Sequence, residues 1–218
     1  MKLTQSEENY LKTIYHLQKD QDAVSTNAVA DVLQTRAASV TDMLKKLNAK
    51  KLLHYKPYYG FYLSAEGRRL ATHIIRRHRL WEVFLSHKLK FGWDEVHSLA
   101  EELEHVSSKK LIDKLDEYLG YPLVDPHGDP IPDSNGKLKP SNAFNLTDLP
   151  ENETAQVVGV TDQSKAMLDD LTEKNIGIGT RIEIRKRSQF DQSLQVKIKN
   201  KYITLTAQLA RHLFVKKV

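Results

Sequence analysis

The sequence contains no cysteine, and this absence removes several kinds of chemistry at once. Disulfide bonds, thiolate zinc sites, iron–sulfur ligation by cysteine and cysteine catalysis are all excluded. Runs of about 18 apolar residues, which a transmembrane helix needs, do not occur either. The N-terminal MKLTQSEENY does not have the apolar core of a signal peptide. We therefore expect a cytoplasmic protein that has no membrane partner.

Proline is scarce outside a single stretch of the chain. Six of the seven prolines lie between Pro122 and Pro150, together with Gly128 and Gly136. Such a stretch cannot continue a helix and predicts a long irregular connection. Helical periodicity precedes it, and strand-like patterns follow it. We therefore expect domains at residues 1–75, 76–122 and 155–218, with a Pro-rich linker at 123–154.

Excess charge of one sign is small overall, but its distribution is uneven. The 33 Lys and Arg exceed the 28 Asp and Glu by a net charge of +5. Residues 1–77 hold 13 basic against 7 acidic residues, residues 78–150 hold 8 against 13, and residues 151–218 hold 12 against 8. A basic N-terminal part suggests a polyanionic partner, while an acidic middle suits cations or simply solubility.

The first 75 residues show the pattern of a winged helix. Two short helices joined by a tight turn, with a following hairpin, are typical of a helix-turn-helix with a wing. The alternative is another small α+β domain. Apolar spacing and capping residues predict helices at Ser6–Lys19, with Ser6 as its cap, at Ser25–Gln34, capped by Ser25 or Thr26, and at Thr35–Leu53, then a hairpin at His54–Ser64 around a Pro57–Gly60 turn.

The start of the third helix is the candidate surface for reading DNA. Short polar groups and a guanidinium there could enter a major groove, and lysines one turn later could contact phosphates without specifying sequence. The alternative for each lysine is a solvated helix face. The predicted DNA-binding residues are Thr35, Arg36, Ser39, Thr41, Asp42, Lys45 and Lys46.

Histidines and glutamates gather at helical spacing in the middle of the chain. A long helix at Ser64–Leu89, capped by Ser64, carries His78 and Glu82 four residues apart. The next helix, VHSLAEELEHVSS, carries a second group of His97, Glu101, Glu104 and His105. Imidazole and carboxylate suit divalent first-row metal ions. The alternative is a solvated acidic helix with incidental histidines.

Catalysis has little support in the sequence. A His/Glu metal site with an open position could serve a hydrolase. However, the chain has no His-Glu-x-x-His pattern, no Gly-rich phosphate loop and no Gly-x-Ser-x-Gly elbow. We therefore expect a protein that is not an enzyme. A winged-helix regulator that senses an organic ligand, with a merely structural His/Glu cluster, stays open as a rival.

The order of these motifs resembles a known family over nearly the whole chain. A winged helix, a helix bearing HRLWE, then VHSLAEELEH and GDPIP are similar to the iron- and manganese-dependent repressors related to diphtheria toxin repressor and the manganese transport regulator. The resemblance implies a homodimeric repressor that is activated by Mn²⁺ or Fe²⁺ at two neighbouring sites per subunit. Its partner would be a pseudo-palindromic double-stranded DNA operator, and its targets metal-uptake or homeostasis genes.

The resemblance also implies a set of metal ligands. Glu101, Glu104 and His105 match one site, with Asn9 where an acidic or thioether ligand is usual. The second site would use His78, Glu82 and His97. Glu101 stands where the iron-sensing branch usually has cysteine, so the expected donors are all oxygen and nitrogen.

Residues 155–218 resemble the small SH3-like β domain that ends longer members of the family. In the family this domain can supply an Asp, Glu or Gln ligand, and Asp162 and Gln163 are the nearest match. The alternative is that both cap the helix that starts at Ser164. The expected fold is mainly α with small β parts, and the last domain is predicted to have strands at 157–163, 179–188, 193–199 and 201–206 and a helix at 165–174.

Overall fold

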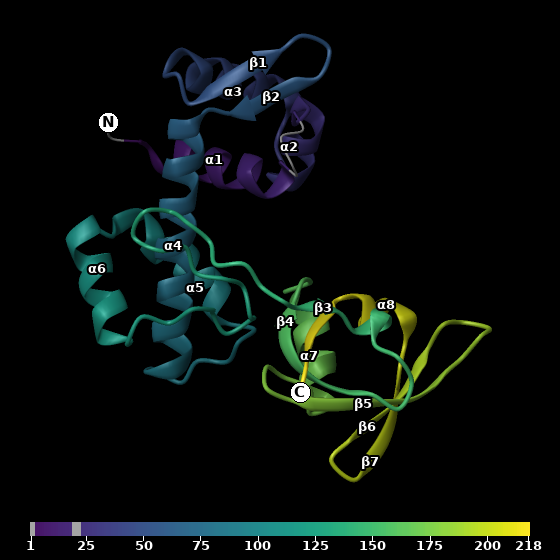
Figure 1. The fold of residues 1–218 in the computed structure, drawn as a ribbon. Coiled ribbons are helices and arrows are strands. Elements are labelled where there is room, and N and C mark those ends of the chain that lie inside the picture. The colour runs from purple at the N-terminus through teal and green to yellow at the C-terminus, as the bar shows by residue number, and fades with distance from the viewer. Residues whose placement is uncertain (1–2, 19–22) are drawn as a thin grey trace. The chain divides into compact units, whose positions relative to one another are not determined.

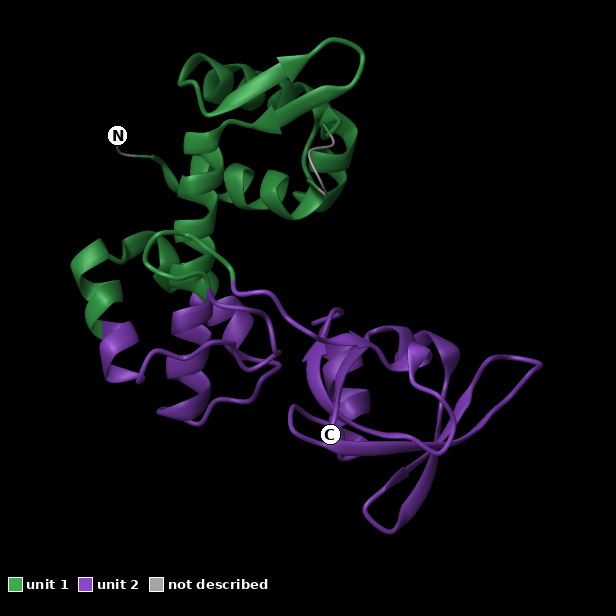
Figure 2. Ribbon diagram, viewed as in Figure 1, with its two compact units in different colours: residues 1–78, 101–114, 132–138 green, residues 79–100, 115–131, 139–218 purple. Residues whose placement is uncertain are grey.

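A computed structural model gives the fold of residues 3–18 and 23–218 (Figure 1). The chain divides into two compact units (Figure 2). Unit 1 comprises residues 1–78, 101–114 and 132–138, and unit 2 comprises residues 79–100, 115–131 and 139–218. Within the described residues, no helix combines the length and the apolar character needed to cross a bilayer.

Unit 1 contains the winged helix. It consists of α1 (Gln5–Leu17), α2 (Thr26–Val32), α3 (Ala37–Ala49), β1 (Leu53–Lys56) and β2 (Gly60–Leu63). Apolar residues at helical spacing on the three helices meet in one core, because burying one face of each helix is what stabilises such short elements. The predicted helix-turn-helix with a wing is confirmed. Side chains of this core with no exposed surface include Leu11, Ile14, Val29, Val40, Leu44 and Leu47.

Several helix boundaries differ from the predicted ones, and two of the differences have a clear physical cause. Helix α1 is capped by Thr4, whose Oγ1 accepts a hydrogen bond from the Glu7 amide while Glu7 Oε2 accepts one from the Thr4 amide, so the prediction of Ser6 as cap is wrong. This reciprocal pair satisfies two amides that the first turn leaves without partners. Helix α3 ends at Ala49, because Lys51 adopts a left-handed φ of 61° and the chain then enters β1. The predicted end of the first helix, Lys19, lies outside the described residues.

Gly60 lets the wing dock against the segment before α2. Strands β1 and β2 pair in antiparallel register from Leu53↔Leu63 to Lys56↔Gly60. The Val24 amide donates to Phe61 O at 2.7 Å and the Phe61 amide to Val24 O at 3.0 Å. Gly60 has a φ of +119°, and a Cβ there would lie 2.3 Å from Val24 O. Only glycine accepts both the backbone conformation and this close approach.

Glu7 ties α1 to α3. Its side chain has no exposed surface, and its Oε1 lies 2.6 Å from Lys50 Nζ and 3.0 Å from Lys46 Nζ. Burial acts to raise the pKa of Glu7, but hydrogen bonds from Lys50, the Thr4 amide and Lys46 outweigh it and lower the pKa to about 2. The carboxylate is therefore ionised at neutral pH, and its ion pairs connect two helices of the winged helix.

Three helices follow the wing. They are α4 (Ala65–His87), α5 (Val96–Val106) and α6 (Lys109–Tyr118), and each contributes residues to both units. Ser64 Oγ accepts from the Gly67 amide at 3.0 Å, as expected for the predicted cap of α4. Six of the candidate metal ligands of the sequence lie on α4 and α5, namely His78, Glu82, His97, Glu101, Glu104 and His105, whereas Asn9 lies on α1 and Asp162 and Gln163 lie in the C-terminal part of unit 2.

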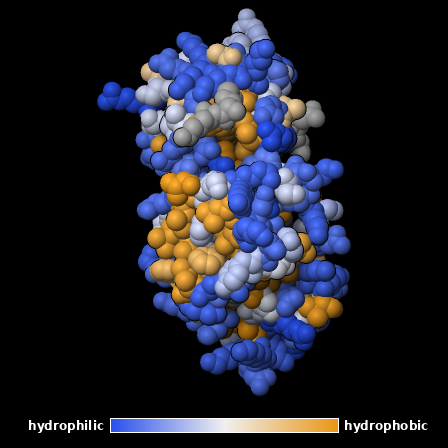
Figure 3. Space-filling model, turned by 90° about the vertical axis from the view of Figure 1, so that its left-hand side faces the viewer, coloured by the Kyte–Doolittle hydropathy of each residue, from blue (hydrophilic) through white to orange (hydrophobic). Residues whose placement is uncertain are grey.

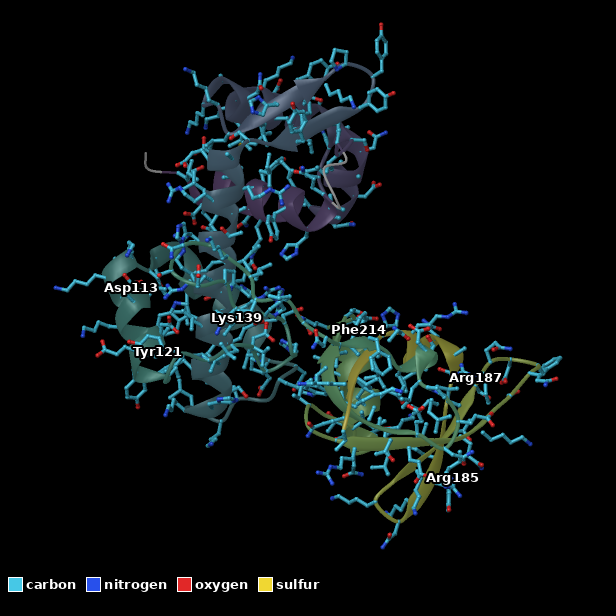
Figure 4. All side chains as sticks on the ribbon, in the orientation of Figure 1. Asp113, Tyr121, Lys139, Arg185, Arg187 and Phe214 are labelled. Atoms are coloured by element: carbon cyan, nitrogen blue, oxygen red, sulfur yellow. The ribbon has the colours of Figure 1, made fainter. Side chains whose placement is uncertain are left out.

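The C-terminal part of unit 2 is a six-stranded antiparallel sheet in the order β3-β8-β4-β5-β6-β7. The predicted SH3-like domain is confirmed, whereas β3, β8 and α8 were not predicted. Arg187 lies at the end of β5 (Figure 4) and donates to Thr147 O at 2.7 Å, which holds η1 against the sheet. The elements are β3 (Phe144–Asn145), η1 (Leu146–Asp148), β4 (Thr154–Val160), α7 (Lys165–Glu173), β5 (Arg181–Arg187), β6 (Leu194–Ile198), β7 (Lys201–Leu205), α8 (Ala207–Arg211) and β8 (Leu213–Lys217).

We predict that Glu7→Gln lowers the free energy of unfolding by about 1–3 kcal/mol at pH 7, because two lysines then lose a buried carboxylate partner. The ordinary pKa of 4.5 exceeds the folded value of about 2, so the charged carboxylate stabilises the fold above pH 4.5 and this contribution disappears as the pH falls toward 2. Urea unfolding of both proteins between pH 7 and pH 3 measures this.

Glu66→Gln is the matched control for that experiment. Glu66 is about half exposed and pairs with Arg69 at 2.6 Å, so its loss should cost less than about 0.5 kcal/mol. A difference between wild type and Glu7→Gln that stays constant as the pH falls would contradict the role assigned to Glu7.

Candidate metal centres and DNA interface

The first candidate metal centre lies in unit 1. Glu101, Glu104 and His105 offer ligand atoms that all lie within 4.8 Å of one another. Their spacing on α5 places the three side chains on one face of the helix. The Glu104 side chain has no exposed surface, and that of His105 is only 5% exposed. The Glu104 carboxylate and the His105 imidazole are thus held away from water, whereas the Glu101 side chain is 34% exposed.

Helix α1 of the winged helix supplies the facing side of this centre. Glu8 Oε2 lies 2.7 Å from His105 Nδ1. Lys12 Nζ donates to Glu101 Oε2 at 2.5 Å and to Glu104 Oε1 at 2.8 Å. The first helix of the winged helix is therefore bonded directly to the helix that carries the candidate ligands.

His78 lies with these residues. Its Nδ1 is 2.7 Å from Glu104 Oε2 and 3.8 Å from Glu101 Oε2. Burial acts to raise the pKa of Glu104, but the hydrogen bond with His78 and the charge of Lys12 outweigh it, so the pKa lies below its ordinary value. Glu104 is therefore a carboxylate that can ligate a cation at neutral pH.

Two buried polar atoms, one on α5 and one on α1, have the chemistry to ligate a divalent cation. If His105 Nδ1 donates to Glu8, the lone pair lies on Nε2, which has no hydrogen-bond partner among the described residues. A carboxylate on the other ring nitrogen is the usual arrangement around a metal-ligating histidine. Asn9 Oδ1 is also buried and, within the described chain, forms no hydrogen bond. Buried polar atoms without partners are rare, and a divalent ion can accept both an imidazole nitrogen and an amide oxygen as ligands.

A second candidate centre lies in unit 2. Glu82, Asp125 and His127 are buried, and their ligand atoms lie within 4.8 Å of one another. His127 Nε2 lies 2.7 Å from Trp93 O, so it carries the proton and leaves the lone pair on Nδ1. That nitrogen and Asp125 Oδ2 have no hydrogen-bond partner among the residues described. The donor set again suits a divalent ion.

Backbone contacts hold the loop that carries Asp125 and His127. Asp125 Oδ1 accepts from the amides of His127 at 2.8 Å and Asp129 at 3.0 Å. The Val160 amide of β4 donates to His127 O at 2.9 Å. Gly128 has a φ of +89°, and a Cβ there would lie 1.9 Å from Val158 O, so only glycine lets the loop approach β4 this closely.

Charge within this second centre is poorly compensated. Burial raises the pKa of Asp125 well above its ordinary value, and the nearby charges of Glu82 and Asp129 raise it further. Arg79 acts in the opposite direction, with its Nε 3.5 Å from Asp125 Oδ2. A divalent cation would relieve the repulsion between the carboxylates.

The sequence prediction found Glu82 and His97 but missed Asp125 and His127. His97 Nδ1 lies 3.3 Å from Glu82 Oε1, and its side chain is 56% exposed. The signal for the missed residues was the segment VDPHGDP, in which ligand-type side chains surround a glycine. It fell within the stretch interpreted as an irregular connection. Glu8 was also missed, because nothing local distinguishes it from a solvated glutamate in a first helical turn.

Asp162 and Gln163 lie at the start of α7. Asp162 Oδ1 accepts from the Ser164 amide at 2.9 Å, which lowers the pKa of Asp162, and this turn ends β4 at Val160, three residues before the predicted end of the strand. Gln163 Nε2 donates to Asp129 Oδ2 at 3.0 Å. Asp162 thus serves the helix start, as the alternative proposed, while Gln163 contacts the loop of the second centre.

The start of α3 carries the expected DNA-binding side chains. Arg36 occupies the N-cap position, and its side chain makes no capping hydrogen bond. Thr41 is half-buried and donates its hydroxyl to Ala37 O at 2.9 Å, so it is less available than predicted. Lys46 is exposed but lies 3.0 Å from Glu7 Oε1. The other predicted residues are exposed: Thr35, Ser39, Asp42 and Lys45.

Three family descriptions match successive parts of the chain. Residues 2–61 match "Iron dependent repressor, N-terminal DNA binding domain". Residues 64–133 match "Iron dependent repressor, metal binding and dimerisation domain", and residues 144–217 match "FeoA domain". The FeoA match covers the SH3-like sheet.

Relatives and solved structures agree with these matches. The diphtheria toxin repressor of Corynebacterium glutamicum is 29% identical over 84% of this chain and 84% of its own. A manganese-dependent transcriptional repressor solved in complex with manganese is 32% identical, covers 97% of this chain and 100% of its own, and gives a TM-score of 0.86. ScaR with bound Zn²⁺ is 30% identical, covers 97% and 99%, and gives a TM-score of 0.79. With the metal-ligand geometry and the winged helix, they show that this chain belongs to the family of iron- and manganese-dependent DNA-binding repressors, which are not enzymes.

Proposed function

We propose that this protein is a homodimeric repressor that binds Mn²⁺ or Fe²⁺ and then binds an operator that controls metal-uptake or homeostasis genes. The observation that carries the proposal is His105, whose Nδ1 is held by Glu8 and whose buried Nε2 lies beside Glu101 and Glu104 without a hydrogen bond. A regulator that senses an organic ligand is the rival. It would not need an imidazole oriented in this way.

The donor atoms favour manganese or ferrous iron over copper(I). Glu101, Glu104 and His105, with Asn9 Oδ1, would hold one ion, and Glu82, Asp125 and His127 a second. His78, beside Glu104, and His97, Asp162 and Gln163 of unit 2 are further ligands that the resemblance implies. Oxygen and nitrogen donors without a thiolate suit Mn²⁺ and Fe²⁺, although Zn²⁺ can bind such sites more tightly. The relatives solved with manganese and with Zn²⁺ fit this expectation.

Helix α1 couples the first centre to DNA binding. Glu8 and Asn9 belong to α1, whereas Glu101, Glu104 and His105 belong to α5. A bound divalent cation supplies the positive charge that the buried carboxylates need. The arrangement of α1 and α5 in which donors from both helices contact the ion would then be favoured. This shift of population would hold the recognition helix α3 in the position that binds DNA.

Exposed apolar side chains support the homodimer. Figure 3 shows apolar surface on the face turned to the viewer. In unit 2 the half-buried rings of Trp81 and Phe84 form one aromatic row with the exposed ring of Tyr118, at centroid distances of 5.7 and 6.4 Å. Patches of this kind mark association surfaces, and residues 64–133 match a dimerisation domain. Further exposed apolar residues of unit 2 are Leu89, Phe91, Tyr121, Leu123 and Val124.

We predict that Glu104→Gln and His105→Ala lower the affinity for Mn²⁺ by about 100-fold and abolish metal-stimulated operator binding, because each removes one ligand. Calorimetric titration with Mn²⁺ and fluorescence anisotropy with operator DNA measure the two effects. Glu102→Gln is the matched control, since Glu102 is exposed on the same helix. Wild-type affinity in Glu104→Gln would remove the first centre.

We predict that Asp125→Asn reduces the number of Mn²⁺ ions bound per subunit from two to one and leaves the first centre intact. The substitution keeps the shape of the side chain but removes the charge that would hold an ion beside Glu82. Equilibrium dialysis with metal analysis gives the stoichiometry, and Asp133→Asn, at an exposed turn, is the control. Two ions in both variants would exclude the second centre.

We predict that Arg36→Ala weakens binding to an operator more than to random DNA, whereas Lys45→Ala weakens both alike. A guanidinium at the start of the recognition helix can read a guanine, with a cost of about 1–3 kcal/mol when lost. A lysine that contacts phosphate affects all sequences and lowers the salt dependence. Equal losses for Arg36→Ala on both DNAs would exclude a base-reading role.

A further inference from the structure

Lys12 occupies the position between the carboxylates of the first candidate centre. Its Nζ lies 2.5 Å from Glu101 Oε2 and 2.8 Å from Glu104 Oε1, and its side chain is only 14% exposed. Glu104 Oε2 is taken by His78 at 2.7 Å. Both oxygens of Glu104 and one of Glu101 are therefore engaged by side chains that are not carboxylates.

The charge balance explains why a cation sits there. Glu8, Glu101 and Glu104 bring three carboxylates to the contact between α1 and α5, and Glu104 has no exposed surface. Buried carboxylates without a cationic partner are strongly destabilising. Arg77 compensates Glu8 at 2.8 Å, and Lys12 compensates the other two. Without metal, Lys12 supplies the positive charge that a divalent ion supplies when bound.

The two cations cannot share these oxygens. A divalent ion between Glu101 and Glu104 would repel an ammonium a few ångströms away, because unit charges at that distance in a protein interact strongly. Lys12 has a flexible stem of four methylene groups and partial access to water, so it can leave. Its departure gives up two ion pairs, and metal binding must outweigh that loss.

We propose that Lys12 is an internal competitor for the divalent ion, and that it sets the metal concentration at which the first centre fills. This inference rests on the proposed function, in which Glu101, Glu104 and His105 hold the ion. Lys12 acts as a positioning residue, because it holds α1 against α5 when metal is absent and releases the carboxylates when metal binds. The threshold therefore depends on a residue of the DNA-binding fold that is not itself a ligand.

The test compares the Mn²⁺ affinity of wild type with that of Lys12 variants of the full chain. Calorimetry measures the affinity, and electron paramagnetic resonance measures the amount of unbound Mn²⁺. Lys12→Gln should bind Mn²⁺ about tenfold more tightly than wild type, because the competitor is gone. Without metal it should unfold at a lower temperature, and Mn²⁺ should raise its melting temperature more than that of wild type.

Lys50→Gln is the matched control. Lys50 pairs with the buried Glu7 at 2.6 Å, so its loss removes the same net charge and also breaks a buried ion pair, but it touches no candidate ligand. Its Mn²⁺ affinity should equal that of wild type. If both variants bind more tightly by the same factor, the effect is general electrostatics, and the competitor role of Lys12 is excluded.

A second variant covers the case in which Lys12→Gln does not fold without metal. Lys12→Arg keeps the positive charge, and its guanidinium can form bidentate hydrogen bonds with carboxylates. The arginine should therefore compete more strongly and weaken Mn²⁺ binding several-fold. The inference would be overturned if Lys12→Arg bound Mn²⁺ with unchanged affinity. It would also be overturned if Lys12→Gln bound Mn²⁺ with unchanged or weaker affinity. Both outcomes count only where the wild type binds Mn²⁺. Wild-type affinity in Glu104→Gln would instead overturn the proposed function, so the two failures are distinguishable.

Discussion

Compensation of buried carboxylate charge is the constraint on which unit 1 depends. Glu104 has no exposed surface and stands beside Glu101, so positive charge must reach it from another element. Lys12 of α1 and His78 of α4 provide hydrogen bonds to its two oxygens. Because a buried charge without partners is costly, α1 must stay against α5 unless another cation replaces Lys12. The packing of α1 on α5 therefore depends on a cation beside Glu104.

Successive residues of α1 turn to different partners. Glu7 is bonded to Lys46 of α3 and to Lys50 directly after it, whereas the next residue, Glu8, is bonded to His105 of α5. Neighbouring residues of an α-helix point about 100° apart, so one helix can contact both. Interactions that fix the position of α1 against α5 therefore also affect the position of α3, which is bonded to α1. This connection lies within unit 1 and consists of direct contacts.

The same constraint recurs in unit 2, with a different solution. Asp125 and Glu82 are buried together, and Arg79 compensates Asp125 only in part, so the pKa of Asp125 rises. The loop around Gly128 is fixed against β4, and Trp93 Nε1 donates to Thr172 Oγ1 of α7 at 3.1 Å. The FeoA-like sheet and the loop that carries Asp125 and His127 are thus one body. Filling this centre would stabilise the contact between them.

Local pattern in the sequence determined the elements and the kind of chemistry. Apolar spacing located the helices of the winged helix, because one buried face is a property of each helix alone. Glu101, Glu104 and His105 were found because residues three and four apart share a helical face whatever surrounds them. The lack of cysteine restricted the donors to oxygen and nitrogen. The family resemblance then gave the repressor function, since the order of motifs is itself a sequence property.

Only the tertiary structure decided which groups share a charge environment. Asp125 and His127 lie about 40 residues from Glu82, within a Pro-rich stretch that shows no periodicity, and meet it because Gly128 lets their loop approach β4. Strand β3 has only two residues, too few to show a pattern of its own, and the pairing of β8 with β3 and β4 joins segments that lie far apart in the sequence. Lys12 looks like a solvated helical lysine in the sequence. Its place between Glu101 and Glu104 follows from the packing of α1 on α5, because burial, not residue type, determines whether a charge must be compensated.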